Sequence, residues 1–147
     1  MRALVVYDSL YGNTEQIAKA IAGAIEGGVK MVRPGEVGPA ELENIGLLVV
    51  GSPTQGGRGT EATRDFLGRI SKAEVNGLDA AAFDTRVEAK VAKIFGYAAG
   101  RIASSLKKKG ANLVAEPEGF FVLGTKGPLK EGELERAATW GKRISGG

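Results

Sequence analysis

The chain has 147 residues, of which 43% are hydrophobic and 25% charged, and both fractions are those of ordinary globular proteins. It has no cysteine and no histidine, which excludes disulfide frameworks, thiolate chemistry, zinc sites and imidazole acid/base catalysis. The 20 basic and 17 acidic residues leave a formal charge of +3, too slight an excess to indicate a nucleic-acid partner. We expect a single domain over residues 1–147.

No apolar run is long enough for a membrane span, and the start of the chain lacks the basic and apolar segments of a signal peptide. We therefore expect a cytoplasmic protein without a membrane span.

Strands and helices alternate along the first half of the chain. Residues 2–7 form an apolar run typical of a buried strand, and residues 13 to about 26 place isoleucines on one helical face. A short strand at Val29–Val32 and a brief helix at Pro39–Asn44 follow. The third strand, Leu47–Val50, is continuously apolar, as expected where helices cover both faces of a parallel sheet.

The second half continues the alternation. Thr60 is the predicted N-cap of a third helix, whose core face carries Phe66, Leu67 and Ile70. The remaining predicted elements are a fourth strand at Leu78–Phe83, a helix over residues 97–109 that stops before Gly110, two strand pieces at Asn112–Ala115 and Phe120–Leu123 around a break at residues 116–119, and a last helix at Glu131–Ile144.

This order of elements predicts an α/β fold, a doubly wound parallel sheet of five strands with helices on both faces. In such folds the ligand lies beyond the carboxyl ends of the strands, where the strand order reverses. The loops after strands one, three and four therefore carry the candidate site.

Loop one, residues 9–14, combines two hydroxyl side chains with glycine and asparagine between a strand and a helix. Such a loop can direct backbone N–H groups and a helix N-terminus at a phosphate dianion. It contains no lysine or arginine and lacks the GK[ST] ending of a nucleotide-triphosphate loop. A tight turn followed by a helix N-cap at Asn13 or Thr14 explains the same residues equally well.

Loop two, residues 51–59, is rich in glycine, which permits the close backbone approach that the edge of a flat heterocycle needs. The alternative interpretation is that loop two is only a flexible connection between the third strand and the third helix. Gly57, Gly59 and Ala62 also match a dinucleotide fingerprint. That match begins seven residues after Val50, at the third strand rather than the first, and we reject it.

Loop three, residues 83–97, begins at the end of strand four with Asp84, Thr85 and Arg86 and reaches Phe95 and Tyr97. Its polar groups suit a ring edge and its aromatic side chains suit a ring face. Asp84 and Arg86 are equally suited to pairing with each other, and Phe95 to the core.

Together the three loops resemble those of the flavodoxin family, and the likeness covers nearly the whole chain. SLYGNT at residues 9–14 is similar to the family's T/SxTGxT phosphate loop and matches it at Ser9, Gly12 and Thr14, whereas Tyr11 stands where threonine is usual. GSPTQGG at residues 51–57 is similar to the second FMN loop of short-chain flavodoxin-like proteins. AFDTR at residues 82–86 is similar to their third.

The resemblance implies a sheet of order 2-1-3-4-5 and one non-covalently bound FMN, without a metal. It also implies that a glycine peptide of loop two, at Gly56 or Gly57, accepts a hydrogen bond from the reduced flavin. Gln55 stands where an aromatic residue is often found, and Tyr97 or Phe95 is the candidate to cover a ring face. The expected FMN contacts are Ser9, Leu10, Tyr11, Gly12, Asn13, Thr14, Pro53, Thr54, Gln55, Gly56, Gly57, Asp84, Thr85, Arg86 and Tyr97.

In function, the resemblance implies an electron carrier that docks transiently with redox partner proteins. The alternative is an FMN-dependent quinone or protoporphyrinogen oxidoreductase of the same fold, so whether the chain is an enzyme stays open. Flavin-free proteins of this topology need residues that the chain lacks. A phosphoacceptor receiver needs an acidic cluster after strand one, where only Asp8 is present, and a low-molecular-weight phosphatase needs a cysteine.

Overall fold

The computed structural model describes residues 2–88 and 96–146. Its strands are β1 (Ala3–Tyr7), β2 (Val29–Val32), β3 (Leu47–Pro53), β4 (Asp79–Val87), β5 (Asn112–Leu113) and β6 (Glu118–Val122). Its helices are α1 (Asn13–Ala24), the 3-10 turn η1 (Pro34–Glu36), α2 (Pro39–Leu42), α3 (Glu61–Arg69), α4 (Lys72–Val75), α6 (Ala98–Lys108) and α7 (Glu133–Ile144). Among these residues no helix is both long and apolar enough to cross a membrane.

The strands form one parallel sheet in the order β2-β1-β3-β4-β5, with β6 also paired to β4. β5 pairs with the start of β4 and β6 with its end, so these two strands together make the fifth position of the sheet. The predicted order 2-1-3-4-5 is thus confirmed, with a split last strand.

The break in the fifth strand lies at residues 114–117, two residues earlier than predicted, because β5 ends at Leu113 and Glu118 and Gly119 are already paired with β4. A Cβ atom on Gly119 would lie 2.2 Å from Cζ of Arg86. The glycine that suggested a turn is therefore a strand position over which the guanidinium group packs.

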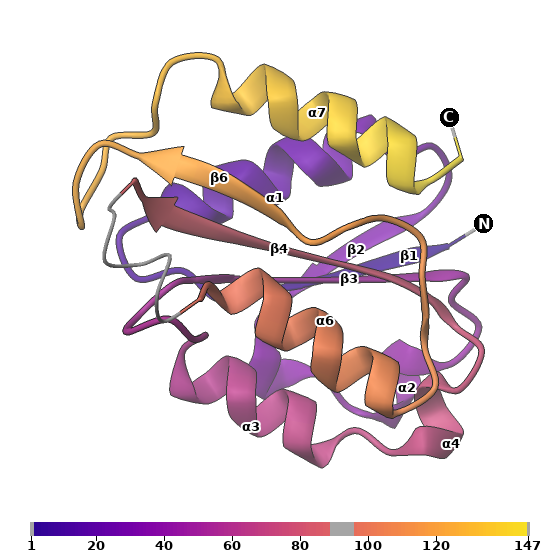
Figure 1. The fold of residues 1–147 in the computed structure, drawn as a ribbon. Helices are drawn as coiled ribbons and strands as arrows, with labels where there is room; N and C mark the ends of the chain where they lie inside the picture. Colours follow the sequence, from indigo (N-terminus) through magenta and orange to yellow (C-terminus); the bar gives the residue numbers. More distant parts are fainter. Residues whose placement is uncertain (1, 89–95, 147) are drawn as a thin grey trace.

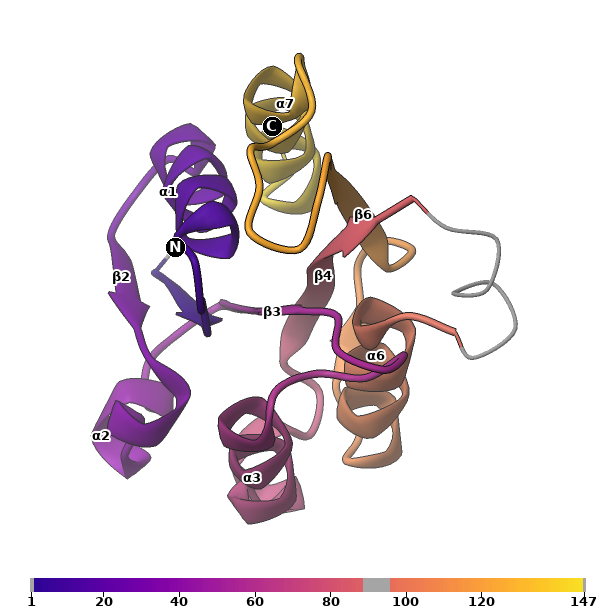
Figure 2. The same ribbon diagram turned by 90° about the vertical axis from the view of Figure 1, so that its left-hand side faces the viewer.

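Helices cover both faces of the sheet, as predicted (Figures 1 and 2). α1 and α7 lie on one face, where Phe83, Phe120 and Trp140 meet edge to face with ring centroids 6.1–6.2 Å apart. α2, α3 and α6 lie on the other face, over a mostly aliphatic core. A Cβ atom on Gly51 would lie 2.0 Å from the Phe83 ring, so the aromatic cluster depends on a glycine in β3.

Two strands run further than predicted, β3 beyond Val50 and β4 beyond Phe83. The added residues pair with each other, Ser52 with Asp84 and Pro53 with Thr85. Loops two and three therefore begin inside the sheet, which fixes the direction in which they leave it.

The short helix α4 was not predicted. It begins with a capping box in which Ser71 and Glu74 each accept the other's backbone N–H.

Candidate functional site

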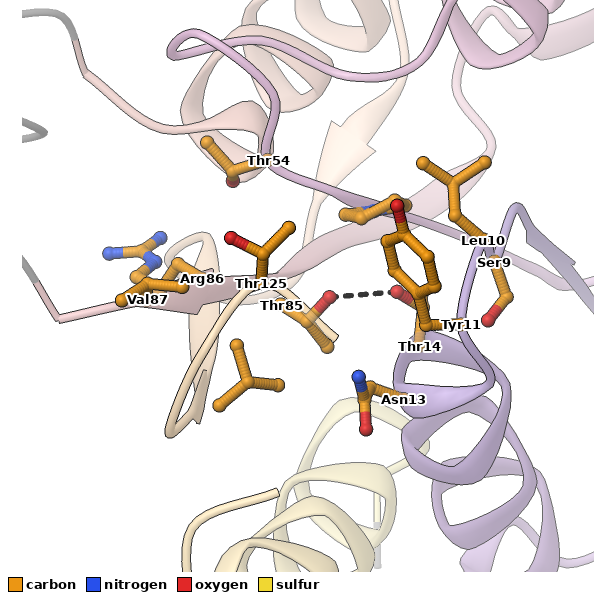
Figure 3. Close-up of a pocket in the computed structure, with 12 residues that line it drawn as sticks. Ser9, Leu10, Tyr11, Asn13, Thr14, Thr54, Thr85, Arg86, Val87 and Thr125 are labelled. Carbon is orange, nitrogen blue, oxygen red and sulfur yellow. Dashed lines mark hydrogen bonds between the residues drawn. The ribbon is translucent and has the colours of Figure 1, made fainter. Parts of the chain in front are cut away.

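A pocket opens at the carboxyl edge of the sheet, where loops one, two and three converge (Figure 3). Most of its lining belongs to the predicted site, namely Ser9, Leu10, Tyr11, Asn13, Thr14, Pro53, Thr54, Thr85 and Arg86. Six predicted residues do not line it, namely Gly12, Gln55, Gly56, Gly57, Asp84 and Tyr97. Three lining residues were not predicted, namely Val87, Val122 and Thr125.

Loop one curls around the hydroxyl of Ser9, which accepts hydrogen bonds from the backbone N–H groups of Gly12 at 3.1 Å and Glu15 at 3.3 Å. Gly12 has φ 93° and is the N-cap of α1, without a side-chain cap. The alternative of a capping side chain at Asn13 or Thr14 is therefore wrong. Glycine is required here because other residues rarely adopt this φ.

The curled loop leaves donors unused. Within residues 2–88 and 96–146, the backbone N–H groups of Leu10, Tyr11, Asn13 and Thr14 have no hydrogen-bond acceptor. They lie at the N-terminus of α1, where the helix dipole favours negative charge. Unpaired N–H groups at a helix N-terminus are what a phosphate group requires.

Thr85 joins the three loops. Its hydroxyl lies 2.7 Å from that of Thr14 in loop one (Figure 3), and its carbonyl accepts the backbone N–H of Thr54 at 2.9 Å. The hydroxyl of Thr54 in turn accepts the N–H of Ala98 at the start of α6 at 3.2 Å. These contacts set the spacing of the pocket walls.

Loop two is a tight hairpin. Gln55 and Arg58 exchange backbone hydrogen bonds of 2.7 and 3.1 Å, and the two residues between them, Gly56 and Gly57, have φ 56° and 82°. Two positive φ angles define a type I′ turn, which explains the pair of glycines.

Two arginines from neighbouring helices fasten loop two. Arg101 donates through Nε to the carbonyl of Gly57 at 2.9 Å, and Arg64 does so to the carbonyl of Gly59 at 3.2 Å. The glycine-rich loop is therefore held by tertiary hydrogen bonds, contrary to the alternative of a loose connection.

In loop three, Asp84 and Arg86 pair with each other. The fully buried carboxylate of Asp84 accepts from Nε and Nη2 of Arg86 at 2.8 and 2.7 Å and also from the N–H of Ala99 at 2.9 Å. The guanidinium of Arg86 lies 3.5 Å from the centroid of the Tyr97 ring. Asp84 thus caps α6 and holds Arg86 in place. Phe95, the other predicted aromatic residue of loop three, lies outside the described residues.

Asp8, directly before loop one, connects this loop to Thr60, which follows loop two, and to Arg33, which follows β2. Its carboxylate accepts the N–H of Ser9 at 2.9 Å, the hydroxyl of Thr60 at 2.5 Å and Nη1 of Arg33 at 3.2 Å. Arg33 also donates to the carbonyl of Ser9 at 3.0 Å. Loop one contains no lysine or arginine, but Arg33, directly after β2, places its guanidinium group against the loop.

Of the unpredicted residues, Val122 is the last residue of β6, and Thr125 lies in the segment after this strand, which we call loop four (residues 123–129). The sequence contains a signal for it, because the turn residues from Gly124 to Pro128 follow a strand in the same βα alternation. Loop four therefore begins at the same carboxyl edge of the sheet as the other three loops.

The flavodoxin family model matches residues 5–140, nearly the whole chain. The chain belongs to the flavodoxin family. Flavodoxins bind FMN and transfer electrons with it, and so does this chain. The site fits the group, because among the described residues loop one has unpaired N–H groups at the N-terminus of α1, and hydroxyl side chains line the adjoining pocket.

Solved structures resemble the whole chain. A flavodoxin from the domain Archaea is 25% identical with a TM-score of 0.84, and the match covers 99% of this chain and 97% of that one. The oxidised flavodoxin 1 of Bacillus cereus is 20% identical with a TM-score of 0.74, covering 98% and 97%. A WrbA-like flavodoxin from Agrobacterium tumefaciens is 22% identical with a TM-score of 0.78, covering 99% and 95%. No curated protein matches the sequence.

Proposed function

We propose that loop one holds the phosphate of FMN and that the threonines of loops two and three hold its ribityl chain. The unpaired N–H groups of loop one are the donors for the phosphate. Thr54 and Thr85 line the pocket next to them, and Arg86 and Val87 line it on the side away from Ser9 and Leu10 (Figure 3). FMN, when bound, takes up and releases electrons, which the side chains of this chain do not do.

We further propose that the protein is a carrier that shuttles electrons between redox proteins docking over this pocket. The observation that carries the proposal is an apolar rim, formed by Leu10, Tyr11 and Val87, with exposed fractions of 49, 52 and 37%. Leu123, directly after the lining residue Val122, is 66% exposed. Exposed apolar side chains gathered around a site mark a surface that another protein covers.

The test is stopped-flow reoxidation of the reduced protein by a quinone and by small redox proteins with acidic and basic surfaces, cytochrome c among them. We expect fast reoxidation by at least one protein acceptor. We expect Leu123→Ser to slow that reaction about fivefold, because part of a leucine side chain is no longer buried at the contact. The quinone reaction should not change.

Leu134→Ser is the matched control, since Leu134 is 42% exposed on α7 and does not line the pocket. If every protein acceptor reacts slowly while a quinone reacts fast and with saturation, the carrier role is refuted. The alternative, an FMN-dependent quinone reductase, would then stand.

A further inference from the structure

Loop four is a closed turn that places Thr125 at its tip. The N–H of Leu123 donates to the carbonyl of Pro128 at 2.9 Å, and the N–H of Gly127 donates to that of Gly124, also at 2.9 Å. Val122 and Leu129 form an antiparallel bridge at its base. The backbone of the loop is thus internally bonded.

This turn packs against loop one. A Cβ atom on Gly127, which has φ 104°, would lie 2.6 Å from Oδ1 of Asn13. Nζ of Lys126 lies 5.8 Å from the ring centroid of Tyr11. Both contacts join loop four to the end of the pocket where loop one presents its unpaired N–H groups.

The side-chain hydroxyl of Thr125 is available to bind a ligand in the pocket. Figure 3 shows its side chain at the pocket with those of Thr54 and Thr85. In the described part of the chain no partner accepts from or donates to this hydroxyl, whereas the hydroxyls of Thr14 and Thr85 bond to each other. Tyr11, moreover, occupies a position of loop one where the family usually has threonine.

We propose that loop four is a fourth wall of the FMN site, in which the hydroxyl of Thr125 donates a hydrogen bond to the phosphate and Lys126 offsets part of its negative charge. Both residues belong to the turn that packs against Asn13 and Tyr11 of loop one. The proposal rests on FMN binding by this chain and is independent of the carrier role.

The test compares FMN with riboflavin, which lacks the phosphate, in titrations that follow flavin fluorescence with the apoprotein. For Thr125→Val we expect FMN to bind about tenfold more weakly, as for a lost hydrogen bond to a charged group. Riboflavin binding should change less than twofold. The phosphorus NMR signal of bound FMN should shift in the same variant.

Lys126→Gln gives an independent measurement. We expect FMN to bind about threefold more weakly at low salt, and the difference to vanish near 1 M salt because the charge is exposed. Thr139→Val and Lys142→Gln are the controls, since both residues lie on α7 and away from this pocket.

Unchanged FMN affinity in both variants overturns the proposal, and so does an equal loss for FMN and riboflavin in Thr125→Val. A wild-type protein that fails to bind FMN would instead refute cofactor binding itself. The unfolding temperature of each apoprotein variant shows whether a loss of affinity comes from misfolding.

Discussion

Loops one and two face the same pocket, yet they use their backbones in opposite ways. Loop one bonds internally through the Ser9 hydroxyl, and four of its N–H groups have no acceptor among the residues that the structure describes. Loop two pairs with itself and has its carbonyls bonded by Arg64 and Arg101. A loop that binds an anion must keep backbone donors free, whereas a loop that contributes a side chain to the pocket is stabilised by satisfying its backbone polar groups.

The largest expected effect is at Gly51, the first residue of loop two, which still lies within β3. Its carbonyl accepts the N–H of Asp8, and an added Cβ would overlap the Phe83 ring. We expect Gly51→Ala to lower the free energy of unfolding by about 3 kcal/mol, measured by urea denaturation. Gly68→Ala, in open space on α3, is the control and should be neutral or slightly stabilising. Equal stabilities of the two variants would contradict the packing argument.

Gly12→Ala tests whether loop one depends on its left-handed residue. With φ 93° and open space around the site, the substitution adds strain but no clash. We expect the unfolding free energy to fall by about 1–2 kcal/mol. FMN affinity should fall as well, because the N–H groups turn away from one another. Gly23→Ala, in the open and inside α1, should not weaken either property.

The link between the two loops is tested by a double-mutant cycle on Asp8 and Thr60, whose side chains meet at 2.5 Å. With Asp8→Asn and Thr60→Val, we expect a coupling of about 1 kcal/mol in the unfolding free energy. The cycle separates this coupling from the role of Thr60 as the N-cap of α3. Additive effects would mean that the loops are held independently.

The smallest effect concerns the support of loop four. Glu133 accepts the N–H of Phe121 at 2.7 Å, and hydrogen bonds from Arg136 hold the pKa of Glu133 below its usual value. The unfolded chain therefore binds more protons than the folded one just below that usual value, about 4.3, and stability is lost as the pH falls through the folded pKa. We expect Glu133→Gln to flatten this acid slope in denaturation at pH 3–6, and the exposed control Glu135→Gln to retain it.

Local sequence determined the alternation of elements, the continuous apolar strands and the position of loop one, because each depends on neighbouring residues alone. Thr60 as the cap of α3 and the glycine turn of loop two also follow from local rules. The strand order and nine of the pocket-lining residues were predicted from the resemblance of the three loops to those of the flavodoxin family.

Only the tertiary structure decided which polar groups meet. Arg33 reaches loop one from the end of β2, and Asp84 pairs with Arg86 while capping α6. Thr125 joins the pocket from a segment more than a hundred residues after loop one. Composition and periodicity describe one segment at a time, whereas these contacts depend on how parallel strands bring distant loops to one edge of the sheet.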